Sequence, residues 1–435
     1  MKISLVSLGC SKNLVDSELI LGSLQKAGHV IVPEQEADAI IVNTCGFIGD
    51  AKRESIDTIL ELSRYKQSGS CSKLIMTGCL VERYSRELKE ELPEVDAFWG
   101  TGNLLNINEA LKSLSPGKIF KNKPGTIYDP DAPRYFLTPN HTSFVKVSEG
   151  CSRTCSFCII PKMRGDMKSR TVESISREIE LLSARDCKEV NLIAQDMTSY
   201  GRDIGVSLEL LLKSLIEVDG IEWIRLHYCY PWGFSDSLVE LISNEEKILS
   251  YIDMPLQHIN DRLLKAMDRK TSASRIRKIV ELLREGISDL TLRTTFIVGF
   301  PGETDEEFEE LLDFVEDTEF DRVGVFKYSI EEGTRAATLG DQVTEEVKQE
   351  RYERLMEIQS RISYDKNQGL VGSIQRTIVD EKENGLYLSR MASQAPEVDG
   401  ITYVSSSRDL DLGEIIEVKI TGFDHFDLEG QAVLN

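Results

Sequence analysis

Three cysteines share one short stretch of the chain: Cys151, Cys155 and Cys158, with the spacing C-x3-C-x2-C. Three such thiolates can hold three irons of a four-iron, four-sulfur cluster and leave the fourth iron open to a small molecule. Runs of four cysteines fill every iron and make electron-transfer sites. A structural zinc loop is the alternative, but zinc needs four ligands, and His141 lies ten residues upstream. The spacing therefore favours a reactive iron–sulfur site.

A second set of cysteines follows predicted strands in residues 1–120. The runs KISLVSLG, DAIIVNTC and KLIMTGC alternate with helical patterns, which predicts a parallel α/β sheet. Each run ends on or just before a cysteine, namely Cys10, Cys45 or Cys79. The carboxyl ends of parallel strands meet at one edge of a sheet, so we expect these thiols to converge. Packing as three buried small side chains is the alternative that the pattern leaves open.

Residues 141–365 repeat a strand followed by a helix six times, which predicts a partial (β/α)6 barrel. Active sites of such barrels lie at the carboxyl ends of the strands. The loop with Cys151 follows the first predicted strand, and Gln195, Gln257 and the turn 299–303 follow later ones. We expect all of them on one face.

The two remaining segments differ in composition from the α/β parts. Residues 121–140 contain four prolines and Gly125, which predicts a linker between residues 1–120 and 141–365. Residues 366–435 carry five short β-prone runs between turns, which predicts a small all-β barrel of the oligonucleotide-binding type. The expected organisation is thus an α/β multidomain chain with three domains.

The net charge of −22, from 51 Lys and Arg against 73 Asp and Glu, disfavours nucleic acid and favours a basic partner. The start of the sequence lacks the basic and apolar regions of a secretion signal, and no apolar run of about 18 residues predicts a membrane span. Nine cysteines without a disulfide pattern indicate a reducing compartment. We expect a cytoplasmic protein with no membrane partner.

Many strings in order resemble the methylthiotransferase family of radical S-adenosylmethionine (SAM) enzymes. The strings are SLGCSKNLVDSE (7–18), VNTCGF (42–47), TGCL (77–80), EGCSRTCSFCIIPKMRG (149–165), LIAQDMTSYG (192–201), DMPLQHINDRLLKAMDR (253–269), FIVGFPGET (296–304), VFKYSIEEGT (325–334), APEVDG (395–400) and FDLEGQ (426–431). The opening string and APEVDG look most like the branch that modifies a ribosomal protein (RimO type). The tRNA-modifying branch usually has Gln-Met-Asn where this chain has Ser11, Lys12 and Asn13.

The resemblance implies the domains, the cofactors and the reaction. It implies an N-terminal cluster domain, a radical SAM barrel and a C-terminal TRAM domain, with Cys10, Cys45 and Cys79 holding a second four-iron, four-sulfur cluster. SAM would serve as radical source and methyl donor, and sulfur would reach the β-carbon of an aspartate in small-subunit ribosomal protein twelve. A low-potential electron donor such as flavodoxin or ferredoxin would be needed.

Other residues are candidates for contacts with SAM, and none is assigned a catalytic role beyond the cluster ligands. Phe157 is expected near the adenine, with ordinary packing as the alternative. Gln195, Gln257, Arg293 and Thr295 either bind polar groups of SAM or are satisfied residues of the barrel interior. Gly299 is expected to form a tight turn near the ligand. Cys71, Cys187 and Cys229 match no motif and are expected to be structural.

Two other functions remain open at this stage. The first is 2-methylthio modification of tRNA adenosine, and the second is a non-catalytic iron–sulfur electron carrier. Residues 365–435 contain 13 Asp and Glu against six Lys and Arg. A domain that binds tRNA should be basic, so this count favours the ribosomal protein and makes tRNA an unlikely partner. Two open three-cysteine sites disfavour the carrier.

Overall fold

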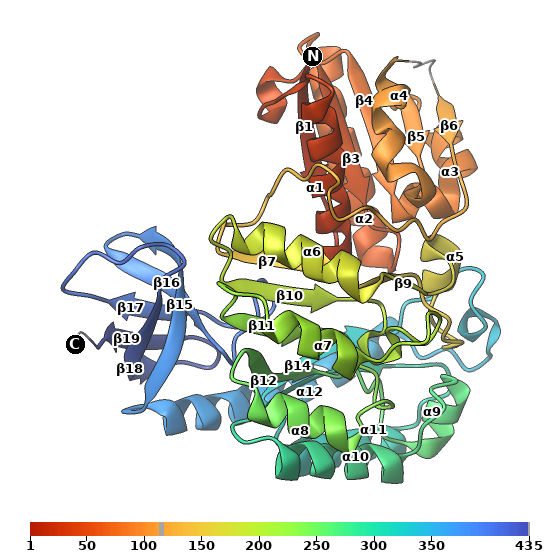
Figure 1. Cartoon of the computed structure of the whole chain (residues 1–435). Helices are drawn as coiled ribbons and strands as arrows, with labels where there is room; N and C mark the ends of the chain where they lie inside the picture. Colours follow the sequence, from red (N-terminus) through yellow and green to blue (C-terminus); the bar gives the residue numbers. More distant parts are fainter. Residues whose placement is uncertain (113–116, 434–435) are drawn as a thin grey trace.

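The computed structural model describes residues 1–112 and 117–433, and it has three folded parts (Figure 1). An N-terminal α/β domain stands on a central half-open barrel, and a small β-barrel lies at one end of that central barrel. This confirms the predicted fold class. Within the described ranges, no helix has the length and apolar character needed to cross a membrane.

The N-terminal domain contains one parallel sheet with the strand order β2-β1-β3-β4-β5-β6. Its strands are β1 (Lys2–Ser7), β2 (Val30–Ile31), β3 (Ala39–Thr44), β4 (Lys73–Gly78), β5 (Ala97–Trp99) and β6 (Lys118–Phe120). Its helices are α1 (Ser11–Lys26), α2 (Gly49–Gln67), α3 (Cys79–Glu91) and α4 (Ile107–Lys112), with 3-10 turns η1 (Glu34–Glu36) and η2 (Thr101–Asn106). Sequence patterns predicted β1, β3 and β4 and missed the three shorter strands.

Both faces of this sheet are covered by helices, as parallel sheets require. Alternate residues of β3 point to opposite sides, so Ile40 packs in a core with Ile59 of α2, whereas Ile41 packs in a separate core with Ile20 of α1. Every residue of β3 is buried. The near-continuous apolar run in the sequence is therefore the signature of a strand that is covered on both sides.

The central barrel is an open parallel sheet of six strands in the order β14-β13-β12-β11-β10-β7. These strands are β7 (Thr142–Lys146), β10 (Glu189–Ile193), β11 (Trp223–Leu226), β12 (Ile248–Asp253), β13 (Thr291–Val298) and β14 (Arg322–Lys327), and β8 (Ser148–Glu149) pairs separately with β9 (Lys168–Ser169). The helices are α5 (Ile160–Arg164), α6 (Val172–Ser183), α7 (Leu208–Ile216), α8 (Asp236–Asn244), α9 (Asp261–Ala266), α10 (Ala273–Gly286), α11 (Asp305–Thr318) and α12 (Glu345–Leu370), with turns η3 (Met197–Ser199) and η4 (Ala336–Thr338). The predicted partial barrel is confirmed.

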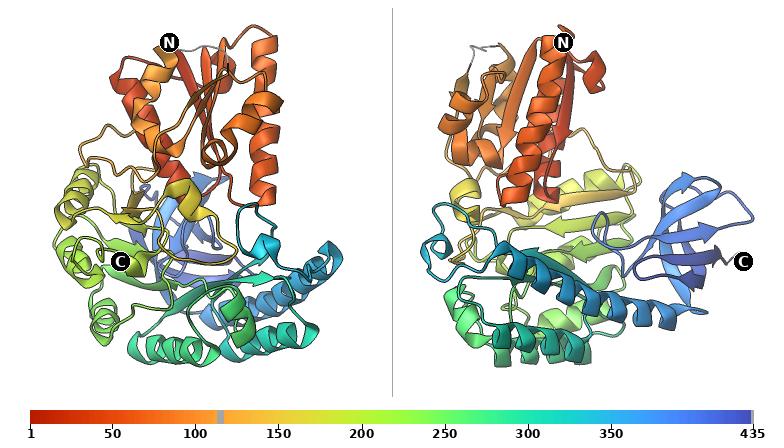
Figure 2. Two further views of the ribbon diagram at one scale, coloured as in Figure 1. Left: turned by 90° about the vertical axis from the view of Figure 1, so that its right-hand side faces the viewer. Right: turned by 180° about the vertical axis from the view of Figure 1, so that it is seen from behind.

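Local sequence sets where most barrel helices begin. Their N-cap side chains accept hydrogen bonds from backbone N–H groups of the first turn, and these caps are Thr171, Ser207, Ser235, Asn260, Ser272, Thr304 and Thr344. The last of them starts α12, which runs beside β14 and reaches the C-terminal barrel (Figure 2). The sequence pattern did not predict this long helix.

The C-terminal part is a closed barrel with the order β15-β16-β17-β19-β18. Its strands are β15 (Ile374–Glu383), β16 (Leu386–Met391), β17 (Thr402–Ser405), β18 (Ile415–Phe423) and β19 (Leu428–Ala432). It contacts the central barrel at the amino ends of the central strands, where Arg390 binds Glu189 and Tyr251 binds Asp399. We call this contact the C-terminal interface.

The N-terminal domain lies over the β7 edge of the central barrel, at what we call the N-terminal interface. Helix α1 lies beside β7 there, and α3 lies beside α5 (Figure 1). Residues 121–140 run between the two parts, and Arg134 in this segment binds Glu18 of α1 and Glu178 of α6. The predicted linker is thus irregular in backbone but firmly packed.

Candidate active site between two cysteine sets

Cys10, Cys45 and Cys79, the strand-end cysteines, lie together at the carboxyl edge of the N-terminal sheet. Cys10 caps α1 after β1, Cys45 follows β3, and Cys79 begins α3 after β4. The thiols are close enough that the charges of Cys45 and Cys10 both help to raise the pKa of Cys79. Residues 69 positions apart in sequence are therefore neighbours in space, as the topology of a parallel sheet dictates.

Two glycines allow these strand ends to approach one another. Gly9 has φ of 90°, and a Cβ on it would lie 2.8 Å from Cys45 Cβ. Gly78 has φ of 99°, and a Cβ there would overlap Oδ1 of Asn43. Both positions need a residue without a side chain, because the left-handed backbone and the close contact each exclude a Cβ. The two glycines that directly precede Cys10 and Cys79 are thus part of the site.

Cys151, Cys155 and Cys158, the loop cysteines, lie on a segment that backbone hydrogen bonds hold from several sides. The N–H of Cys151 donates to the carbonyl of Gly165 at 3.0 Å, and the N–H of Cys158 donates to that of Cys155 at 3.2 Å. Ser156 donates to the carbonyl of Met267 at 2.9 Å and accepts from the N–H of Ala336 at 2.9 Å. The loop is therefore fixed in place by elements distant in sequence.

The short helix α5, which follows the loop cysteines, contacts the strand-end set across the N-terminal interface. Cys79 packs against Ile159 and Met163, which lie in and beside α5, directly after Cys158. At the end of α5, Nε of Arg164 donates to Sγ of Cys79 at 3.2 Å. One short helix thus contacts a strand-end cysteine and leads directly from a loop cysteine.

A buried ion network surrounds this contact. Arg164 binds Asp16 of α1 at 2.6 Å, and Nζ of Lys146 lies 2.5 Å from Asp16 and 2.8 Å from Glu149. Burial alone would raise the pKa of Glu149, but Lys146 and Arg164 lower it to about 2. All four side chains are buried, and each charge has a partner, as burial of ions requires.

Two arginines lie over the ring of one tyrosine beside the loop cysteines. The guanidinium carbons of Arg153 and Arg269 lie 3.9 Å and 4.2 Å from the ring centroid of Tyr230. Nη1 of Arg269 donates to Sγ of Cys155 at 3.7 Å. Arg153 also binds Asp196 at 2.6 Å. This stack places a positive charge next to a thiol that is expected to carry iron.

Gln195 and Gln257 lie on the same face of the barrel as the loop cysteines. Nε2 of Gln195 donates to Glu149 at 3.0 Å, and its buried Oε1 has no hydrogen-bond partner in residues 1–112 and 117–433. Gln257 has φ of 76°, a strained value for a residue other than glycine. Its backbone bonds to Thr295 and Ile297 fix this geometry at 2.8 Å each.

The other candidate SAM contacts are more dispersed. Arg293 binds Asp253 at 3.1 Å and lies 3.6 Å from Asp399. Thr295 lies in β13 and pairs with Gly324 of β14. Gly299 has φ of 71°, in keeping with a tight turn, but a Cβ there would overlap Lys348 of α12 rather than enter the space between the cysteine sets.

Phe157 and the remaining cysteines lie in packed surroundings. The half-buried ring of Phe157 packs against a cluster that includes Met267 and Phe300. Cys71, Cys187 and Cys229 are all buried. The thiols of Cys71 and Cys187 donate to backbone carbonyls of Lys73 at 3.1 Å and Glu189 at 3.3 Å, which supports a structural role.

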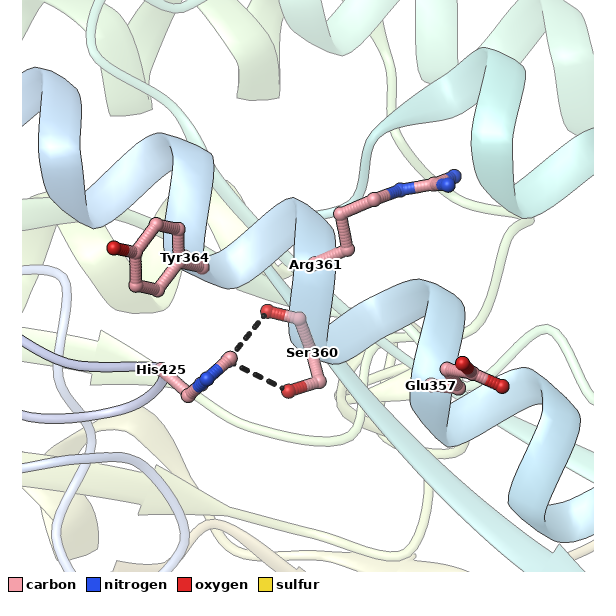
Figure 3. Close-up of a pocket in the computed structure, with 5 residues that line it drawn as sticks. All are labelled: Glu357, Ser360, Arg361, Tyr364 and His425. Atoms are coloured by element: carbon pink, nitrogen blue, oxygen red, sulfur yellow. Dashed lines mark hydrogen bonds between the residues drawn. The ribbon is translucent and has the colours of Figure 1, made fainter.

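A hollow of about 520 Å³ lies along α12, beside the segment that carries His425 (Figure 3). Its lining residues are Glu357, Ser360, Arg361, Tyr364 and His425. Nδ1 of His425 lies 2.9 Å from Oγ of Ser360, so the hollow joins α12 to the C-terminal barrel. Within the described residues, none of the predicted site residues lines it.

Known proteins match the chain over nearly all of its length. The family profile described as Radical SAM superfamily matches residues 145–315, that of the TRAM domain matches residues 371–433, and that of Uncharacterized protein family UPF0004 matches residues 2–100. The protein named ribosomal protein uS12 methylthiotransferase RimO of Syntrophotalea carbinolica is 48% identical over 99% of this chain and 97% of its own. Those of Geotalea uraniireducens and Clostridioides difficile are 49% and 45% identical over 99% and 100% of this chain, and over 98% and 99% of their own lengths.

This chain belongs to the RimO family of radical SAM methylthiotransferases. Among solved structures, the radical SAM methyltransferase TsrM of Kitasatospora setae resembles it with a TM-score of 0.51 and 14% identity, over 74% of this chain and 72% of TsrM. At that identity the likeness concerns the fold alone. As a RimO-family enzyme, the chain uses SAM and four-iron, four-sulfur clusters.

The donor atoms of both cysteine sets fit the clusters of a RimO-family enzyme. Burial raises the pKa of the thiols of Cys45 and Cys151 to about 11, and those of Cys79 and Cys158 to about 12. Without iron these thiols are neutral, so binding of a cluster must displace protons. In residues 1–112 and 117–433, no three Cys, His, Asp or Glu side chains lie close enough to share a single metal ion. The ligands of a cluster bind separate irons and need not converge on one ion.

Lys12 is a further charged residue of this RimO-family site. In the sequence it stood out only because Ser11, Lys12 and Asn13 differ from the Gln-Met-Asn of the tRNA-modifying branch. The side chain of Lys12 is buried, and Nζ lies 2.8 Å from the ring centroid of Tyr228, which follows β11. Burial lowers the pKa of Lys12 to about 8, although Cys10 and Asp253 oppose this. Arg164 was also missed, because Asp16 and Cys79, which it binds, lie in another domain. For Lys12, the departure from Gln-Met-Asn at residues 11–13 was the signal that the sequence offered.

Proposed function

We propose that this chain attaches a methylthio group to the β-carbon of an aspartate in ribosomal protein uS12. The relatives named for that activity match at 45–49% identity over nearly the full chain. The observation in the site that carries the proposal is the packing of Cys79 against Ile159 and Met163, because it brings a sulfur-delivering set next to a radical-forming one.

The chain's own residues have distinct roles in this proposal. The loop cysteines hold one cluster and the strand-end cysteines hold the other. When bound, the two clusters and SAM supply hydrogen abstraction, sulfur and a methyl group. Arg164 fixes the distance between the two sets, because it bonds to Cys79 from α5 and to Asp16 from α1. The buried network around it excludes water from the reaction space.

The SAM contacts belong to the same proposal. Gln195 is the strongest candidate, because its buried Oε1 has no partner in residues 1–112 and 117–433 and can accept a hydrogen bond from the ligand. Gln257 supports a ligand contact through its strained backbone at the strand end. Phe157, Arg293, Thr295 and Gly299 remain predicted contacts, and each of them also has a packing or pairing role in the fold.

The net charge of the chain and the need of the reaction for electrons indicate the proposed partners. A chain with a net charge of −22 suits a basic ribosomal protein. The residues from 365 onward are acidic too, so tRNA is the less favoured substrate. A low-potential donor such as flavodoxin or ferredoxin would supply electrons. The cytoplasm is the proposed location, because its thiols stay reduced.

Anaerobic reconstitution tests the proposal directly. The chain is loaded with iron and sulfide, supplied with SAM and a reductant, and offered free uS12, intact small ribosomal subunits and tRNA in separate reactions. Mass spectrometry should find one methylthio group on an aspartate of uS12, and comparison of the two uS12 reactions shows which form is used. A methylthio group on tRNA adenosine, with none on uS12, would contradict the proposed substrate.

A further inference from the structure

Lys12 reaches from the N-terminal domain into the mouth of the barrel. It is the second residue of α1 and lies two positions after Cys10. Only 6% of it is exposed, and its ammonium group lies over the ring of Tyr228. Tyr228 follows β11 at the carboxyl end of the barrel strands and has a left-handed φ of 61°. Lys12 therefore places a positive charge where the two cysteine sets face each other.

The carboxylates nearest to Lys12 are already paired with other cations. Glu149 binds Lys146, and Asp253 binds Arg293 at 3.1 Å. No carboxylate within residues 1–112 and 117–433 lies within 4.0 Å of Nζ of Lys12, and no hydrogen bond to this atom is formed there. A buried ammonium without an anion is unfavourable, so the site is suited to an anionic ligand group that arrives with the substrate.

We propose that Lys12 binds the carboxylate of the target aspartate and thereby positions its β-carbon between the two cysteine sets. The inference rests on the proposed function, which supplies the aspartate. The β-carbon is bonded directly to the carboxylate carbon, so a group that fixes the carboxylate also fixes the reacting carbon. Holding reacting atoms in place is a large source of rate enhancement. The same contact selects aspartate over asparagine, because only aspartate brings a charge that pairs with a buried ammonium.

The ring of Tyr228 makes this arrangement possible. A tyrosine face attracts the ammonium and holds its position without neutralising its charge. The hydrogen-bonding directions of Nζ that point away from the ring remain available to an incoming carboxylate. A carboxylate in the place of Tyr228 would instead satisfy Lys12 permanently and remove its use for substrate.

A different role for Lys12 would be to balance the charge of a cluster held by Cys10. The two roles predict different effects of replacing Lys12 on iron content and on substrate discrimination. A counter-charge for the cluster predicts lower iron content when Lys12 is replaced by an uncharged residue. A carboxylate-binding residue predicts unchanged iron content and a loss of discrimination between aspartate and asparagine in the substrate.

The test compares reconstituted wild-type enzyme with Lys12→Met, Lys12→Arg and the control Lys26→Met. Lys26 lies on the same helix but is exposed, so its replacement removes an equal charge away from the site. Each holoenzyme is titrated anaerobically with purified uS12 that carries the target aspartate, and with uS12 that carries asparagine there. The wild type should bind the aspartate form at least about tenfold more tightly, the effect of one charge-assisted contact.

Lys12→Met should bind both forms of uS12 with the same Kd as the wild type shows for the asparagine form. Lys12→Arg should keep most of the discrimination, and Lys26→Met should keep all of it, with equal iron and sulfide in all four proteins. Wild-type discrimination in Lys12→Met, or a loss of iron in that variant, would overturn the inference. A wild-type enzyme that leaves uS12 unmodified would instead overturn the proposed function, and the inference with it.

Discussion

The central barrel contacts a second domain at its β7 edge and a third at the amino ends of its strands, and both interfaces contain buried ion pairs. At the N-terminal interface, Arg164 and Lys146 bind acidic groups within a few ångströms of Cys79. At the C-terminal interface, Arg390 and Arg225 bind Glu189 at 2.7 and 3.0 Å, and the buried thiol of Cys187 donates to the backbone carbonyl of Glu189 rather than to its carboxylate. Buried ion pairs thus occur in two settings: one network borders the proposed active site, and the other joins two domains.

The interfaces also differ in which ends of the strands they contain. The N-terminal interface is built from strand ends, where the fold gathers reactive side chains. The C-terminal interface lies at the amino ends of the barrel strands, where side chains serve stability rather than catalysis. Changes at the first should therefore alter the reaction, and changes at the second should alter stability alone.

The largest effect is expected from replacing the loop cysteines together by alanine. Cys151, Cys155 and Cys158 are the proposed holders of the cluster that binds SAM, so reductive cleavage of SAM should fall below detection. The strand-end set lies in another domain and should still assemble, which leaves about half of the iron. Deoxyadenosine formation and iron content measure the two effects. Deoxyadenosine at the wild-type level would contradict the assignment of the SAM site.

Replacing the strand-end cysteines by alanine should separate the two half-reactions. With Cys10, Cys45 and Cys79 changed, the loop cluster should remain and SAM should still be cleaved. No methylthio product should form on uS12, because the proposed sulfur-delivering cluster is lost. Product analysis by mass spectrometry, alongside deoxyadenosine measurement, checks this. Product at the wild-type rate would reduce these cysteines to packing residues.

The next comparison uses one arginine from each interface. Arg164→Met and Arg390→Met each remove one of two cations that bind a buried carboxylate, because Lys146 still binds Asp16 and Arg225 still binds Glu189. Each variant should therefore lower the free energy of unfolding by less than the roughly 3–5 kcal/mol that a fully unpaired buried charge costs. Only Arg164→Met should also suppress product formation, because Arg164 contacts Cys79. Urea unfolding measures the first effect, and modification of uS12 at a temperature where both variants stay folded measures the second. Equal loss of product in both would remove the functional distinction between the interfaces.

The sequence predicted the fold class and the positions of the cysteines because these depend on local patterns. Apolar runs that end at Cys10, Cys45 and Cys79 show the strand ends directly. The strand β5 (Ala97–Trp99) is too short to show a period, and its place in the sheet comes from pairing with β4. Arg164 could not be found in this way, since its partner Asp16 lies 148 residues away.

The smallest effect concerns acid and the C-terminal interface. Burial would raise the pKa of Glu189, but Arg390 and Arg225 lower it well below its usual value of 4.5. A carboxyl group with a lowered pKa stabilises the fold above its ordinary pKa, and this contribution is lost as the pH falls below that value. Glu189→Gln should therefore be less stable than wild type at pH 7, and the difference should shrink below about pH 4.5.

Glu222→Gln is the matched control for this acid effect, because Glu222 pairs with Arg376 at the surface of the same interface, with both side chains 47% exposed. Such a pair contributes only about 0–1 kcal/mol, so its removal should leave the pH dependence of unfolding unchanged. Urea unfolding midpoints measured between pH 7 and 3.5 make the comparison. If the difference in stability between wild type and Glu189→Gln stays constant over this range, the charge of the Glu189 carboxylate does not contribute to stability through Arg390 and Arg225. The joining of the two barrels would then depend on the apolar contacts of Trp223, Leu249 and Ile378.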